Sequence, residues 1–352
     1  MLRFAFFCLG YVYAPAVIAA ASLRGPWVLI PAALTFVALP ILDLLLGRSL
    51  WNPPPELESK LARAPVYRLV TWIWVPTALA VTGYAIAAAA APSWSWPERL
   101  GLAVGVGLMN TAMSINYAHE LVHQANRFEV FLGEVLLNLT SYTHFRIEHV
   151  FGHHRYVATP RDPATARFHE SFYAFLPRSV AAQIASAWDL ECRRLARAVK
   201  PAIGASNRML WYASALAITY AAVAAFFGWI GVVFFAVQSV VAFSSLEVIN
   251  YLEHYGLTRQ ARPDGSGYER VRPHHSWNSP HRVTNWFLIN LARHSDHHAN
   301  AGRRWQLLRT FDEQDAPQLP AGYATMYLLA LVPPLWFAVM DPRVERWKEQ
   351  HA

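Results

Sequence analysis

Long stretches without a charged residue dominate the pattern of hydrophobic and polar positions along the chain. Arg24 separates two of them, and Glu98 with Arg99 separates two more. A helix needs about 20 mostly apolar residues to cross a hydrocarbon layer of about 30 Å. The pattern therefore predicts membrane-spanning helices over residues 4–23, 25–42, 69–97 and 100–118, and a further 38-residue uncharged stretch over 209–246.

The last of these stretches is too long for one span. A single helix of that length would measure about 57 Å at 1.5 Å per residue, and Gly228 and Gly231 lie at its middle. We therefore predict two helices joined by a tight turn, which makes about six transmembrane helices in an all-α integral membrane protein. In residues 321–340, Pro333 and Pro334 predict a broken helix that is embedded in the membrane or lies at its surface.

Composition and charge agree with this fold class. Hydrophobic residues make up 55% of the chain and charged residues only 15%, which argues against an ordinary soluble enzyme. The basic residues gather in the loops and in the tail, so both termini and both long polar segments are expected on the cytoplasmic side. This placement accounts for the net charge of +7 without a nucleic-acid partner.

These patterns divide the chain into five segments. Spans 1–4 occupy residues 1–118, spans 5 and 6 occupy 209–248, and a membrane-associated helix and tail occupy 321–352. Two cytoplasmic segments, 119–208 and 249–320, lie between them and contain four groups of histidines. The groups are His119 with His123; His149 with His153 and His154; His254; and His294 with His297 and His298.

The spacing of these histidines points to metal binding. Residues four apart lie on one face of a helix, and three groups contain such a pair. Nine imidazoles exceed the coordination of one ion but give two ions four or five ligands each, and imidazole is a good ligand for iron. The neighbouring acids are expected to orient the imidazoles or simply to lie at helix ends, and Glu253 is also a possible direct ligand; these acids are Glu120, Glu148, Glu253 and Asp296.

A competing interpretation uses only the first group. His119-Glu120-x-x-His123 matches the zinc metalloprotease motif, in which two histidines bind zinc and the glutamate acts as general base. It would leave the other clustered histidines unexplained, so the dinuclear interpretation is preferred.

The histidine groups and their surroundings resemble the membrane-bound alkane 1-monooxygenases (alkane omega-hydroxylases) of the membrane fatty acid desaturase and hydroxylase superfamily. The resemblance extends from about residue 25 to the tail. Its motifs are Glu148-His149-Val150-Phe151-Gly152-His153-His154, Asp162-Pro163-Ala164-Thr165, Asn250-Tyr251 with Glu253-His254-Tyr255-Gly256, His274-His275-Ser276-Trp277-Asn278-Ser279 and Arg293-His294-Ser295-Asp296-His297-His298.

The resemblance implies a bacterial inner-membrane enzyme with a cytoplasmic, histidine-rich di-iron domain. Such an enzyme uses two iron ions (Fe2+/Fe3+) and dioxygen to convert medium- or long-chain alkanes to 1-alkanols. Reduced rubredoxin, itself reduced by rubredoxin reductase, would supply the electrons. Cys8 and Cys192 are the chain's two cysteines and cannot form a rubredoxin site, so both partners are expected to be separate proteins. Hydroxylation of alkyl-aromatic methyl groups and lipid desaturation remain alternatives, because those enzymes share the histidine motifs.

Overall fold

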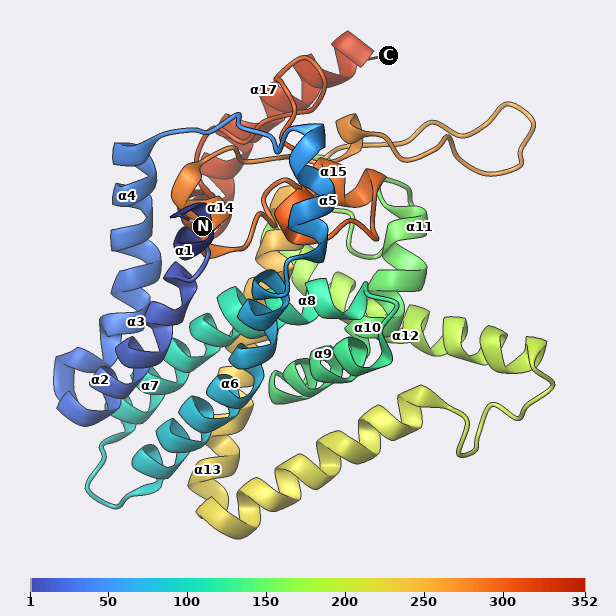
Figure 1. The fold of residues 1–352 in the computed structure, drawn as a ribbon. Coiled ribbons are helices and arrows are strands. Elements are labelled where there is room, and N and C mark those ends of the chain that lie inside the picture. Colours follow the sequence, from blue (N-terminus) through green and yellow to red (C-terminus); the bar gives the residue numbers. More distant parts are fainter. Residues whose placement is uncertain (1, 352) are drawn as a thin grey trace. The chain divides into compact units, whose positions relative to one another are not determined.

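The computed structural model describes residues 2–351, and helices joined by loops make up its fold (Figure 1). Within those residues, β-structure is limited to isolated bridges such as Ala261 with Tyr268. The α-helices of the N-terminal half are α1 Leu2–Phe6, α2 Tyr13–Leu23, α3 Ile30–Ala33, α4 Leu39–Leu46, α5 Pro55–Arg63, α6 Val66–Ala90, α7 Trp96–Met109, α8 Asn116–Val122, α9 Arg127–Leu139, α10 Phe145–Glu148 and α11 His154–Tyr156.

The C-terminal half adds six α-helices, and short 3-10 and π segments connect several elements. The helices are α12 Phe172–Arg197, α13 Arg208–His254, α14 Arg282–Phe287, α15 His294–Ala299, α16 Tyr323–Ala330 and α17 Pro333–His351. The 3-10 segments are Leu9–Val12, Gly25–Leu29, Pro273–His275 and Trp305–Leu307, and the π segments are Leu34–Ala38, Asn110–Ile115 and His149–His153.

The chain folds into two compact units, each built from separate stretches of sequence. Unit 1 comprises the residues up to Ala38, Pro65–Ile147 and Ala187–Leu246. Unit 2 comprises Leu39–Ala64, Glu148–Ser186 and the residues from Glu247 onward.

Unit 1 is a bundle in which α2, α6 and α7 pack against one another (Figure 1). Gly107 of α7 permits a close approach between α7 and α13. A Cβ atom on Gly107 would lie 2.6 Å from Cβ of Val241, closer than side-chain atoms come. Any larger residue at position 107 would therefore force α7 and α13 apart.

The structure supports an integral membrane protein. Within residues 2–351, four helices are long and apolar enough to cross a bilayer, and a fifth span results if one sharply bent helix pair counts as a single crossing. The four are Phe4–Leu23, Gly25–Leu46, Pro55–Ala90 and Arg208–His254, and the bent pair is Tyr323–Ala330 with Pro333–Gln350.

The predicted breaks in the long apolar stretches are confirmed. Gly228 has φ 65° and ψ −167°, so α13 consists of two helices that meet at a sharp turn. The pair α16 and α17 is bent by 119° just before Pro333. Helix α6, in contrast, continues through Pro76.

Residues 100–118 are less regular than a simple apolar span. They contain the end of α7, the π segment Asn110–Ile115 and the start of α8. Polar side chains such as Asn110 and Ser114 interrupt the apolar sequence here, and this segment is not among the four long apolar helices. That it crosses the membrane, as the count of about six spans assumes, stays a prediction.

The core of unit 2 fixes the end of α13. Rings of Tyr251 and Tyr255 lie 5.0 and 5.2 Å from Trp336 of α17. Both phenols are also tethered, because Tyr251 donates to the carbonyl of Glu170 at 2.6 Å and Tyr255 donates to Asp341 at 2.5 Å. His254 lies between these two anchors in the sequence, so its ring has little freedom to move.

Candidate metal centre

Unit 2 brings seven of the nine predicted ligands together from three places in the chain. The first place is the π segment His149–His153 with α11, the second is the last residue of α13, and the third is α15. Two sets of histidines form. The larger contains His153, His254, His294 and His298, and the smaller contains His149, His154 and His297.

The larger set is buried and closely packed. Each of its four side chains is at most 5% exposed. The Nε2 atoms of His153 and His298 are 3.2 Å apart, those of His298 and His294 are 2.9 Å apart, and those of His294 and His254 are 3.2 Å apart. Four imidazole nitrogens thus converge on one small volume.

The smaller set is built in the same way. Nε2 of His154 lies 3.1 Å from Nε2 of His149 and 3.0 Å from Nε2 of His297. The π segment explains the first contact, because a π turn brings residues five apart over one another. His149 therefore meets His154, and His153 is directed into the other set.

The two adjacent histidine pairs are divided between the sets. His153 and His298 belong to the larger set, whereas their neighbours His154 and His297 belong to the smaller one. Consecutive residues on a helix point about 100° apart, so a doublet cannot serve one ion easily but can serve two. Each doublet thus offers one ligand to each of two metal positions.

Unit 1 carries the two remaining histidines. His119 lies in the last turn of α8 and His123 caps that helix. Their rings are 5.1 Å apart, edge to face, as the spacing of four predicts. Glu120, between them, accepts a hydrogen bond from Nε2 of Gln124 at 2.9 Å.

Two carboxylates set the orientation of rings in the larger set. Oδ2 of Asp162 lies 2.9 Å from Nδ1 of His153, and Oε1 of Glu253 lies 3.2 Å from Nδ1 of His294. The carboxylates are fixed in turn, Asp162 by the hydroxyl of Thr165 at 2.6 Å and Glu253 by the hydroxyl of Tyr323 at 2.7 Å. A carboxylate at Nδ1 keeps the proton there and leaves the Nε2 lone pair for a metal.

The other two acids proposed from the sequence have different surroundings. Asp296 accepts both hydrogen bonds from Arg303, at 2.8 and 2.7 Å, and one from the backbone of Arg309 at 2.9 Å. It fastens the loop that follows α15. Glu148 is buried, and its pKa is raised well above the usual range by that burial and by the nearby carboxylates of Asp162 and Glu247.

The donor set suits a metal cation better than it suits hydrogen bonding. With its proton held at Nδ1 by Asp162, His153 presents a lone pair at Nε2. Nδ1 of His254 and Nδ1 of His298 have no hydrogen-bond partner among the described residues, although both are buried. Burial and the neighbouring imidazoles also lower the pKa of His298 well below its usual range, so that ring is neutral. A cation bound among the four Nε2 atoms would accept the lone pairs that neutral imidazoles direct there.

A third group consists of residue types that can bind a metal, but its ring protons are placed for hydrogen bonding. Glu269, His274 and His275 lie close together. Nδ1 of His275 accepts the backbone N–H of Arg272 at 3.0 Å, so Nε2 carries the proton and faces Oε1 of Glu269 at 3.3 Å. This arrangement is a hydrogen-bonded pair, because the proton on Nε2 of His275 occupies the position where a metal would need a lone pair.

Sequence reasoning named the histidines but gave no role to two residues that support them. Asp162 stands in the quoted motif Asp162-Pro163-Ala164-Thr165, and only the structure shows that it faces His153. Asn278 accepts the backbone N–H of Ser295 in α15 at 2.9 Å and donates to that residue's hydroxyl at 2.5 Å. It thereby fixes the helix that carries His294, His297 and His298.

Comparisons with known proteins agree with this geometry. The fatty acid desaturase family model matches residues 93–330. Alkane 1-monooxygenase 2 of Alcanivorax borkumensis is 41% identical over 92% of the chain and 84% of its own length. Alkane 1-monooxygenase 1 of Pseudomonas aeruginosa is 43% identical over 88% of the chain and 80% of its own length. The hydroxylase component XylM of a xylene/toluene monooxygenase from Pseudomonas putida is 25% identical over 93% of the chain and 85% of its own length.

Proposed function

The chain belongs to the alkane 1-monooxygenase family, within the fatty acid desaturases, and from that membership we propose that it hydroxylates the terminal carbon of medium- or long-chain alkanes. The product is the 1-alkanol, and dioxygen supplies the oxygen atom. Relatives about 40% identical over most of the chain carry this activity in their names.

The observation that carries the proposal is the division of the histidine doublets. Two separate imidazole sets built from alternate members of the same doublets are what a dinuclear site requires. We propose iron for both positions, because an all-imidazole set with carboxylates behind it is compatible with non-haem iron. The proposed ligands are His119, His123, His149, His153, His154, His254, His294, His297 and His298, the first two on the strength of their spacing and of the family motif.

The residues around the site prepare it for oxygen chemistry. Iron bound there would supply the activation of dioxygen and the transfer of one oxygen atom to a C–H bond. Asp162 holds the proton of His153 at Nδ1, which keeps Nε2 of that ring directed inward, and Oε1 of Glu253 lies 3.2 Å from Nδ1 of His294. Burial of the larger set excludes bulk water, which would otherwise compete with an apolar substrate.

Electrons must reach the site from outside the chain. With two cysteines in the whole sequence, the protein cannot form its own four-cysteine rubredoxin centre. We propose reduced rubredoxin as the donor and a separate rubredoxin reductase that regenerates it. The positive net charge suits an acidic electron carrier through electrostatic steering.

The membrane location follows from the same proposal. We place the protein in the bacterial inner membrane, with the metal site and both termini on the cytoplasmic side. The basic loops support this orientation. Substrate would then arrive from the bilayer, where alkanes dissolve.

An alkyl-aromatic substrate is a second possibility, because XylM aligns over 93% of the chain. Its identity is 25%, against about 40% for the alkane enzymes, which favours alkanes. The zinc-protease alternative would use only His119, Glu120 and His123, and would leave the seven converging histidines of unit 2 without a role.

The test is product analysis in cells that also express rubredoxin and its reductase. Cells are fed octane, hexadecane and p-xylene separately, and the oxygenated products are identified. We expect 1-octanol or 1-hexadecanol as the main product. A benzylic alcohol from p-xylene with no 1-alkanol would reject the alkane assignment, and an alkene product would indicate a desaturase.

A further inference from the structure

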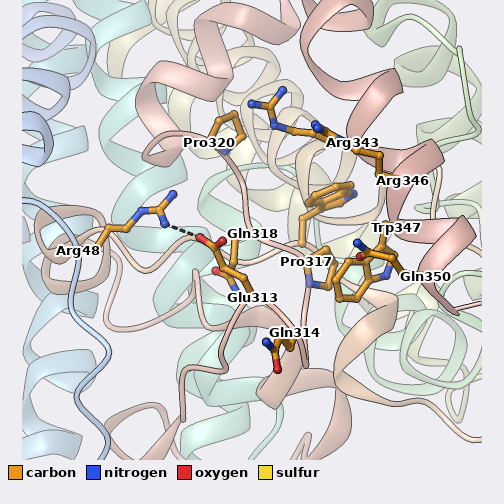
Figure 2. A pocket seen from close by; sticks show the side chains of 11 residues that line it. Arg48, Glu313, Gln314, Pro317, Gln318, Pro320, Arg343, Arg346, Trp347 and Gln350 are labelled. Atoms are coloured by element: carbon orange, nitrogen blue, oxygen red, sulfur yellow. Dashed lines mark hydrogen bonds and ion pairs between the residues drawn. The ribbon is translucent and has the colours of Figure 1, made fainter.

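Unit 2 also contains a pocket whose lining is unlike that of the metal centre. A pocket of about 840 Å³ lies between α17 and the segment 313–320, with Arg48 and Trp277 completing its wall. Figure 2 shows Arg343 and Arg346 close together at one side of the pocket, and Arg48 paired with Glu313 at another. Volumes of this size are typical of small-molecule sites.

One face of α17 forms much of the wall. Arg343, Arg346, Trp347 and Gln350 all line the pocket, and their spacing of three, four and seven places them on one side of the helix. The acidic residues of the same stretch, Glu345 and Glu349, are exposed and do not line it. The helix therefore turns two arginines and no carboxylate towards the pocket.

The pocket has more positive than negative charge. Its lining includes three guanidinium groups and one carboxylate, Glu313, which pairs with Arg48 at 2.7 Å. Arg343 donates to the carbonyl of Val339 at 2.5 Å, and Arg346 donates to that of Pro342 at 3.1 Å. Neither has a carboxylate partner among the described residues. Since each guanidinium has five N–H donors, both retain donors for an anion with several oxygens.

The neighbouring sequence places the pocket where an apolar surface ends. Arg48 follows by two residues the candidate span Gly25–Leu46. The last turn of that span exposes Leu44, Leu45 and Leu46 at 83%, 72% and 48%. Three exposed leucines in a row are unfavourable in water but suit contact with lipid chains. With these leucines in contact with lipid chains, the pocket beyond Arg48 would lie at the level of the lipid headgroups.

We propose that this pocket binds the phosphate group of an anionic phospholipid. Arg343 and Arg346 contact the phosphate oxygens, as guanidinium groups do in charge-assisted pairs. The acyl chains lie along the exposed leucines at the end of α4. A soluble phosphate ester would share the headgroup chemistry but would gain nothing from those leucines.

The experiment measures lipid binding to the full-length protein in detergent by native mass spectrometry. Dioleoyl phosphatidylglycerol is titrated against the wild type and against R343Q/R346Q. The matched control is R197Q/K200Q, which removes the same two charges from an exposed position outside the pocket. We expect binding to weaken on the order of tenfold or more in R343Q/R346Q and to change less than twofold in the control.

Three further arms decide between sources of the anion. Inorganic phosphate and glycerol 3-phosphate at millimolar concentration should not displace the lipid, and displacement by either would overturn the lipid assignment in favour of a soluble ligand. Equal lipid binding by all three proteins would also overturn it. So would a loss of rubredoxin binding in R343Q/R346Q with lipid binding intact, because the pocket would then be a protein-docking surface.

Misfolding must be separated from loss of the site. Helix content and bound iron of R343Q/R346Q should equal those of the wild type. The variant R343K/R346K keeps the positive charges but replaces each planar guanidinium, with its several N–H donors, by an ammonium group. We therefore expect its lipid binding to be intermediate between that of the wild type and that of R343Q/R346Q. Lipid binding by R343K/R346K no better than by R343Q/R346Q, with both folded, would contradict direct contact with the phosphate.

Discussion

Two buried polar regions of this protein differ in how their hydrogen bonds are satisfied. In unit 1, Trp74 donates to Ser114 at 3.0 Å, Ser114 donates to Asn110 at 2.7 Å, and the amide of Asn110 donates to Gln238 at 3.0 Å. Gln238 completes the series by donating to the carbonyl of Leu139 at 2.9 Å. Every donor in this series has an acceptor, so the network is stable without a ligand.

The larger histidine set of unit 2 is the opposite case. Its four Nε2 atoms face one another, and Asp162 holds the proton of His153 at Nδ1, on the far side of that ring. Nδ1 of His254 and Nδ1 of His298 are buried and have no hydrogen-bond partner among the described residues. A buried polar group without a partner costs about 1–3 kcal/mol. The histidine set is therefore suited to binding a cation, whereas the polar groups of the unit 1 network satisfy one another without a ligand. The difference can be tested by substitutions on each side.

The largest effect is expected from the ligands. His153→Ala or His297→Ala should abolish alkane hydroxylation and lower bound iron, because each removes one of the converging imidazoles. Elemental analysis of purified protein and product yield in cells measure the two effects. His169→Ala is the control, since that ring is exposed and faces Asp341. Unchanged iron content in either ligand variant would refute its role as a ligand.

The next largest effect is expected from the carboxylates behind the rings. Asp162→Asn keeps the shape but removes the charge that holds the Nδ1 proton of His153, and such changes typically cost about 10–100-fold in metal affinity or activity. Iron affinity, measured by chelator competition, should decrease by a factor in that range. Asp189→Asn, which alters only an exposed ion pair with Arg193, should leave it unchanged. Wild-type affinity in Asp162→Asn would mean that the carboxylate does not orient the imidazole.

A smaller effect is expected in the unit 1 network. Asn110→Leu removes the amide that donates to Gln238 and the oxygen that accepts from Ser114. It should destabilise the protein by about 1–3 kcal/mol, with no direct effect on bound iron. The double variant N110L/Q238L should recover part of the loss, because removing both polar groups leaves fewer unsatisfied atoms. Thermal unfolding in detergent measures this change. A double variant less stable than the sum of the two single variants would contradict the account.

The smallest effect is expected at the third histidine group. Glu269→Gln keeps an acceptor for the Nε2 proton of His275 and should leave bound metal and activity unchanged. The pKa of His275 is lowered to about 4 by burial first and by His274 second, so the ring is neutral near pH 7 in the native protein. A loss of one metal ion per chain in this variant would show that the group binds metal after all.

Much of the fold follows from local features of the sequence. Arg24 ends α2 where a charge interrupts the apolar stretch, and Gly228 breaks the stretch over 209–246 as its position predicted. Residues 100–118 are harder to predict, because hydropathy does not reveal that Asn110 and Ser114 lie in a π segment with buried partners. Charge and proline positions are local properties, whereas buried pairing is not.

The sequence by itself determined which side chains are available for metal, because imidazole groups at spacings of three and four can share a helix face and few other functions need so many. It did not determine their grouping. Only the tertiary structure decided that His153 joins His298 and that His154 joins His297. It also placed Asp162 behind His153, and Arg343 in the same pocket as Arg48. These partners are far apart in the chain, and no local pattern encodes distances that depend on how the helices pack.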